Sequence, residues 1–150
     1  MHNDKAISVL NNLIETVKDG EQGFRTAAEG LKDPQTKSLF NDYSRQRAQM
    51  ARELQDEVRR LGGDPEKSGS TAGALHRGWM DIKSVVTGKD DHAIVAEAER
   101  GEDVAKNVYD EALKEPLPDS ARIVVQQQAA KVREAHDRVR NIRDRDKVAH

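Results

Sequence analysis

The stretch LGGDPEKSGSTAGALHRGWMDIK at residues 61–83 decides the fold because it makes up most of the long connection, residues 62–90, that separates two helical halves of the chain. It opens on LGGDP, in which a glycine suited to the left-handed conformation and a following proline form a strong helix stop. An up-and-down bundle needs only a short loop at this point, whereas this connection is long enough to run along a bundle. The apolar spacing over residues 71–87 predicts a short helix within it.

Two long amphipathic helices precede this connection and two follow it. Apolar residues recur every three or four positions over about residues 4–32, 34–61, 91–115 and 119–145, as in helices with one buried face. LKDP joins the first pair and KEPLPDS joins the second, so each pair forms a tight hairpin. The sequence therefore predicts an all-α, ferritin-like four-helix bundle of two antiparallel hairpins joined by a long crossover, as a single domain over residues 1–150.

The composition suits a helical bundle and argues against several functional classes. Hydrophobic and charged residues each make up 35% of the chain, and each helix of a bundle buries only a narrow stripe. The net charge of −2 provides no basic field, so we expect no nucleic-acid partner. The chain has no cysteine, which excludes disulfides and thiolate chemistry. It shows neither a secretory signal nor an apolar run of about 20 residues, so we expect a cytoplasmic protein without membrane contact.

Charged residues interrupt the apolar stripes of three helices. Glu21 stands in the stretch VKDGEQGF, at a step where an apolar residue is expected. Arg47 interrupts the stripe of the second helix and Glu102 that of the third. Counting along the helices from their expected ends brings His136 of the fourth helix to the same height, with Glu99 as an alternative to Glu102. These residues predict one polar layer across the bundle.

This layer resembles the metal centre of ferritin-like di-iron carboxylate bundles. Those proteins use one Glu from each of two helices and a Glu-x-x-His pair from each of the other two. The residues at the matching positions of this chain are Glu21, Glu102 or Glu99, and His136. The chain departs from the pattern where RAQM and REAH place Arg47 and Arg133 in the position of a glutamate. Because arginine cannot ligate a cation, the resemblance implies a degenerate site rather than a dinuclear oxidase.

Longer stretches are similar to a bacterial ferritin-like four-helix-bundle family of unknown function. They are LNNLIETVKDGEQGF, LGGDPEKSGSTAGALHRGWMDIK, AEAERGEDVAKNVYDEAL and AHDRVRNIRD. The resemblance covers nearly the whole chain. It implies the bundle fold and a bacterial source, and it brings no known activity.

Three functional hypotheses follow from these observations. The favoured one is a non-enzymatic bundle that acts through a protein partner or as a homo-oligomer, with Glu21 and Arg47 as a core ion pair and no cofactor. Its expected buried polar cluster is Glu21, Arg47, Glu99, Glu102, Arg133 and His136. The second is a metal-binding protein, for which the expected ligands of iron, zinc or manganese are Glu21, Glu99, Glu102 and His136. The third is a small-ligand carrier, although the Ala and Gly residues on the seams favour close packing of the helices.

Overall fold

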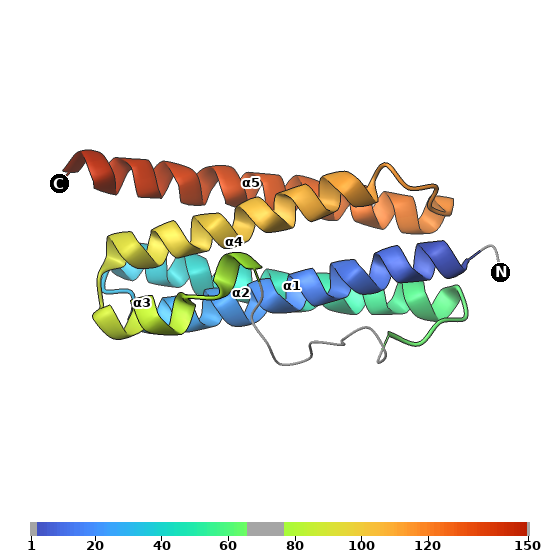
Figure 1. The fold of residues 1–150 in the computed structure, drawn as a ribbon, viewed down its shortest axis with the longest axis horizontal. Coiled ribbons are helices and arrows are strands. Elements are labelled where there is room, and N and C mark those ends of the chain that lie inside the picture. Colours follow the sequence, from blue (N-terminus) through green and yellow to red (C-terminus); the bar gives the residue numbers. More distant parts are fainter. Residues whose placement is uncertain (1–2, 66–76, 150) are drawn as a thin grey trace.

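The computed structural model describes residues 3–65 and 77–149, and their regular structure is entirely helical. The elements are α1 (Asp4–Gly30), α2 (Pro34–Arg60), the 3₁₀ turn η2 (Arg77–Trp79), α3 (Ile82–Gly88), α4 (Asp91–Ala112) and α5 (Asp119–Ala149). Helices α1 and α2 form one antiparallel hairpin, and α4 and α5 form the other (Figure 1). The chain crosses from one end of the molecule to the other between the hairpins. The all-α bundle with its crossover is therefore confirmed.

Local capping sets the ends of α2 where the sequence predicts them. The Asp33 carboxylate accepts hydrogen bonds from the Thr36 backbone N–H at 3.0 Å and from the Thr36 hydroxyl at 2.6 Å. Both hydrogen bonds lower the pKa of Asp33, and the one from the Thr36 hydroxyl has the larger effect. Pro34 follows at the first helical position, where its missing N–H is not needed. At the other end Gly62 has a φ of 85°, which favours glycine and ends the helix.

The remaining helix ends differ from the expected ranges by a few residues. The third long helix ends at Ala112 rather than at residue 115, because the Lys114 N–H already bonds to the Glu111 carbonyl in a tighter turn. The fourth continues to Ala149. None of the helices in the described part of the chain combines the length and apolar character that a membrane span requires.

The core consists of two apolar clusters, one in each half of the bundle. One cluster is built around Leu10, Leu13, Leu54 and Val125. The other is built around Phe24, Phe40, Trp79, Ile82 and Ile94. Along α2 and α4, the buried charged residues Arg47 and Glu102 stand between the two clusters. A polar layer thus separates the two apolar clusters.

In the part of the crossover that the structure describes, the expected helix is interrupted. Residues 71–76 of the helix expected at 71–87 lie outside the described residues, and the rest is divided into η2 and the seven-residue helix α3. The division falls before Ile82 because the Asp81 backbone N–H donates at 2.7 Å to the Glu97 carboxylate instead of a helix carbonyl. The expectation of one continuous crossover helix is therefore wrong.

Trp79 holds the crossover against the bundle. Its side chain is 3% exposed and lies between Gly23 of α1 and Gly101 of α4. A Cβ atom at either glycine would stand 2.3 Å from atoms of the indole, so both positions require glycine. The Phe24 ring adds an edge-to-face contact, with ring centres 5.0 Å apart. The small residues on the seam thus serve close packing.

Candidate metal site on α4 and α5

Arg47 of α2 and Glu102 of α4 form a completely buried ion pair. Arg47 Nη1 donates to Glu102 Oε2 at 2.7 Å, and Nη2 donates to the other carboxylate oxygen. Gly20 makes room for this guanidinium, since a Cβ there would lie 3.1 Å from Nη1. The guanidinium carbon also lies 5.3 Å from the centre of the Phe24 ring. Burial acts to lower the pKa of Arg47, but the charge and hydrogen bonds of Glu102 outweigh it and raise that pKa above its ordinary value.

Glu21 does not pair with Arg47, so the ion pair expected from the sequence is wrong. Its carboxylate is half-buried and lies 3.8 Å from Arg25 Nη1 on its own helix. Between Val17 and Phe24 either Gly20 or Glu21 can face the core, because both positions fit a helical period of about 3.6 residues. The structure buries Gly20 and leaves Glu21 at the edge of the stripe. Arg47 instead takes Glu102, which comes from the other hairpin.

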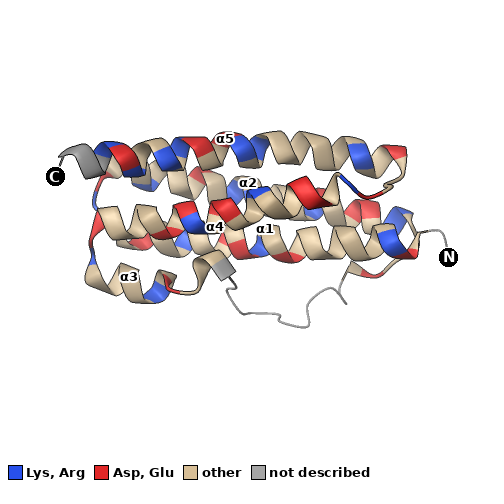
Figure 2. Ribbon diagram, turned by 45° about the horizontal axis from the view of Figure 1, so that its top comes forward, with Lys and Arg blue, Asp and Glu red and all other residues tan. Residues whose placement is uncertain are grey.

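A ladder of charged residues joins the outer faces of α4 and α5. Its members on α4 are Glu99, Asp103 and Asp110, and those on α5 are Arg133, His136 and Arg143. Arg133 Nη2 lies 2.9 Å from Asp110 Oδ1, and its side chain is 57% exposed. The expectation that Arg133 belongs to a buried layer is therefore wrong. Both helices carry acidic and basic residues; acidic ones predominate on α4 and basic ones on α5 (Figure 2).

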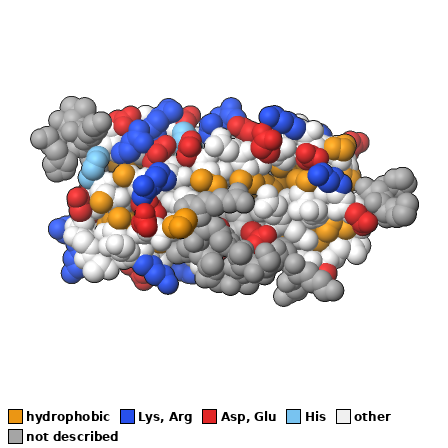
Figure 3. Space-filling view, viewed as in Figure 1, with side chains coloured by type: hydrophobic (Ala, Val, Ile, Leu, Met, Phe, Trp, Pro, Cys, Tyr) orange, Lys and Arg blue, Asp and Glu red, His pale blue; other side chains and the backbone are white. Residues whose placement is uncertain are grey.

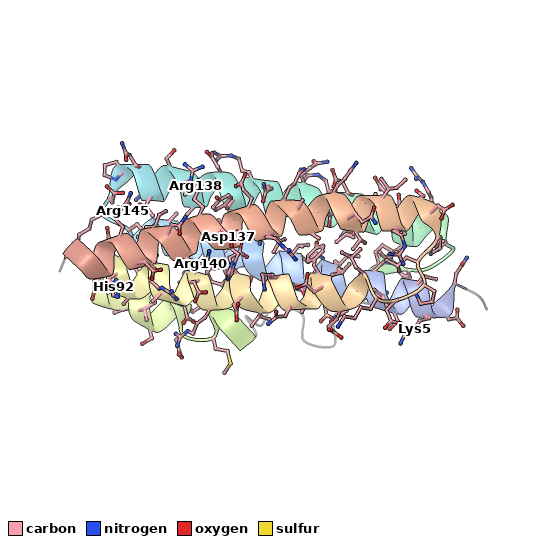
Figure 4. All side chains as sticks on the ribbon, turned by 90° about the horizontal axis from the view of Figure 1, so that it is seen from above. Lys5, His92, Asp137, Arg138, Arg140 and Arg145 are labelled. Atoms are coloured by element: carbon pink, nitrogen blue, oxygen red, sulfur yellow. The ribbon has the colours of Figure 1, made fainter. Side chains whose placement is uncertain are left out.

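His136 lies within this ladder, and its side chain is buried. Its Nδ1 atom lies 3.0 Å from Asp137 Oδ1. The hydrogen bond from His136 lowers the pKa of Asp137, so this carboxylate is ionised and can only accept. Nδ1 is therefore the nitrogen that donates to Asp137, and when the ring is neutral the lone pair lies on Nε2. Asp137 also lies 3.5 Å from Arg140, and the two residues sit together midway along α5 (Figure 4).

The Nε2 atom of His136 faces two carboxylates. It lies 3.3 Å from Glu99 Oε2 and 3.4 Å from Asp103 Oδ1, and the three ligand atoms all lie within 4.8 Å of one another. Nevertheless this buried nitrogen makes no hydrogen bond with any residue that the structure describes. A tetrahedral ion with bonds of about 2.0–2.1 Å has ligand–ligand separations of roughly 3.4 Å. The two nitrogen–oxygen separations match this value, and the three atoms are of the kinds that bind metal ions.

The candidate site overlaps only in part with the residues singled out from the sequence. Glu99 and His136 come together, whereas Glu102 is engaged by Arg47 in the core. Asp103, which the sequence reading missed, supplies the third oxygen. Its position four residues after Glu99, on the same helix face, is the signal that could have identified it.

A separate open groove of about 540 Å³ lies between α1 and α4. Val9, Val104 and Val108 are among the residues that line it. Lys5 and Glu115 also line it and lie 3.7 Å apart as an ion pair. The molecular face in Figure 3 shows a row of hydrophobic side chains among charged ones. This groove offers no cluster of ligand atoms comparable to the one around His136 in the described residues.

The fold and the site together define an all-α bundle with a buried ion pair and an outer carboxylate–histidine cluster. The chain belongs to the family described as Domain of unknown function (DUF2383), whose model matches residues 5–115. No curated protein matches the sequence. The matched part contains Glu99 and Asp103 but not α5, so His136 comes from outside it.

Proposed function

We propose that the protein binds one divalent transition-metal ion through Glu99, Asp103 and His136. The observation that carries the proposal is the buried Nε2 of His136, which lacks a hydrogen bond among the described residues and faces two carboxylate oxygens at 3.3 and 3.4 Å. Three electron-rich atoms around one point repel one another unless a proton or a cation lies between them. An imidazole with two carboxylates suits zinc, iron(II) or manganese(II).

The surroundings of the cluster support a metal ion over a proton alone. The Asp137 carboxylate lies at hydrogen-bond distance from His136 Nδ1, and a ligating histidine is usually oriented by such a contact at its other nitrogen. Asp103 is 54% exposed, so an ion can reach the site from solvent and keep water in its remaining positions.

The helix order supports kinship with ferritin-like carboxylate bundles, which hold their metals in the bundle core. In this chain Arg47 and Glu102 fill the core position, and a guanidinium there disfavours a cation. The proposed ion therefore lies on the outer side of α4 and α5, and we assign no catalytic residue. Association with a protein partner or a second copy stays a prediction, as does a small-ligand role.

Metal titration of the untagged protein tests this function. We expect wild type to take up about one equivalent of Mn²⁺ or Zn²⁺, with competition between them, and His136→Gln to lose at least about tenfold in affinity. His92→Gln is the matched control, because His92 is on α4 but outside the cluster. Retention of less than about a tenth of an equivalent by wild type, or an equal loss in both variants, would contradict the proposal.

A further inference from the structure

The two oxygens of the Glu99 carboxylate have different partners. Oε2 faces His136 Nε2 at 3.3 Å, while Oε1 lies 3.0 Å from Arg143 Nη1. The Glu99 side chain is 13% exposed and that of Arg143 is 31% exposed, so the carboxylate is largely buried and the guanidinium is partly exposed. One oxygen of Glu99 is thus available to the proposed site, and the other is already engaged.

Arg143 is itself held in place by its neighbour in the sequence. Its Nε and Nη2 atoms lie 3.1 and 3.0 Å from Asp144 Oδ1. The planar guanidinium therefore uses one edge for Asp144 and its remaining nitrogen for Glu99. Because the fork is rigid, fixing one edge also fixes the direction of Nη1. Glu99 is thereby restrained in orientation as well as neutralised.

We infer that Arg143 sets the metal preference of the proposed site by limiting Glu99 to one coordinating oxygen; this inference rests on the proposed function. Calcium takes 6–8 oxygen ligands and commonly uses both oxygens of a carboxylate. Transition ions accept fewer ligands at shorter distances and favour an imidazole nitrogen. A site with Glu99 held to Oε2 and with His136 as a ligand therefore selects a transition ion over calcium.

The orienting role is separable from the positive charge of Arg143. Any nearby cation weakens the binding of every divalent ion by repulsion, so loss of charge alone raises both affinities together. Loss of orientation releases Oε1 of Glu99 and favours calcium more than a transition ion. The ratio of the two affinities therefore reports on positioning, and the individual affinities report on charge.

Calorimetric titration with Mn²⁺ and with Ca²⁺ tests this inference on four proteins: wild type, Arg143→Gln, Arg143→Lys and Arg133→Gln. We expect the Mn²⁺ to Ca²⁺ affinity ratio to fall at least about tenfold in both Arg143 variants. Lysine keeps the charge but cannot span Glu99 and Asp144 with a planar fork. Arg133→Gln removes an equal charge from the same ladder, and its partner is Asp110, so its ratio should stay within about threefold.

The outcomes separate the two proposals. If wild type binds neither ion, the proposed function fails and this inference fails with it. If wild type binds Mn²⁺ but the ratio is unchanged in both Arg143 variants, only the role of Arg143 is overturned. A wild-type ratio in Arg143→Lys, together with a changed ratio in Arg143→Gln, shows that the planar fork of arginine is not required and also overturns it. Circular dichroism of each variant checks that the helices are retained.

Discussion

Among the residues that the structure describes, Arg47 has the largest side chain that is fully enclosed in the core. Taking a guanidinium out of water carries a penalty of several kcal/mol, which only good geometry can offset. Glu102 supplies that geometry by accepting a hydrogen bond at each carboxylate oxygen, and the Phe24 ring adds a cation–π contact. Because the pair joins α2 to α4, it fixes the register of one hairpin on the other at the level between the two apolar clusters.

Breaking this pair is expected to destabilise the fold strongly. Glu102→Gln leaves the Arg47 charge buried without its counterion, and we expect the free energy of unfolding to fall by about 3–5 kcal/mol. Urea unfolding followed by circular dichroism measures the change. The double variant Arg47→Met with Glu102→Leu removes both charges and should recover most of the loss. A loss below about 1 kcal/mol in Glu102→Gln would show that water reaches the pair.

At the scale of elements, the crossover depends on its docking. Helix α3 has seven residues, too few for an isolated helix to be stable in water. The Trp79 side chain attaches the crossover to the bundle by packing into the slot between Gly23 of α1 and Gly101 of α4. The buried Glu97 carboxylate accepts a hydrogen bond from the Asp81 backbone N–H, and this bond connects the start of α3 to α4. Tertiary contacts therefore stabilise this segment.

Filling one side of the Trp79 slot tests this dependence. In Gly101→Ala the new methyl would stand 2.3 Å from the indole, and we expect a loss of about 2–3 kcal/mol in unfolding free energy. Trp79 is the only tryptophan of the chain, so its fluorescence should shift toward that of an exposed indole. Gly88→Ala is the control, because nothing lies within 4 Å of a Cβ there. We expect it to be neutral or slightly stabilising; equal losses in both variants would argue against the slot.

At the scale of the whole molecule, both tyrosines are buried with their hydroxyls near the polar layer. Tyr109 donates to Gln128 Oε1 at 2.7 Å, and the Tyr43 hydroxyl lies 3.5 Å from Glu134. Burial, followed by the charge of Glu134, raises the pKa of Tyr43 to about 12. Burial likewise raises the pKa of Tyr109. The folded bundle therefore resists the loss of either phenolic proton.

This arrangement predicts alkaline destabilisation. The unfolded chain releases the Tyr43 proton near its ordinary pKa of 10, whereas the folded chain holds it until about pH 12. The contribution of Tyr43 is thus complete below pH 10 and is lost as the pH rises from 10 to about 12. Urea unfolding at several pH values in this range measures the slope. Tyr43→Phe should show a shallower slope than wild type; identical slopes would contradict the prediction.

Much of the fold follows from local sequence signals. Asp33 and Pro34 start α2, and Gly62 ends it, through hydrogen bonds and backbone angles that neighbouring residues determine. The length of the connection after Gly62 leads to the crossover, because a short loop cannot run along a bundle. The interruptions in the apolar stripes likewise locate Arg47 and Glu102 at buried positions.

The sequence by itself determined the helices, their order and the presence of charges on the buried faces, because these depend on short-range periodicity and capping. Only the tertiary structure decided that Gly20 rather than Glu21 faces Arg47, and that Asp103 joins His136. An error of one residue turns a side chain by about 100° around a helix. Two helices each carry that uncertainty in rotation and height, so the partners of a side chain on a neighbouring helix are fixed only when the helices pack.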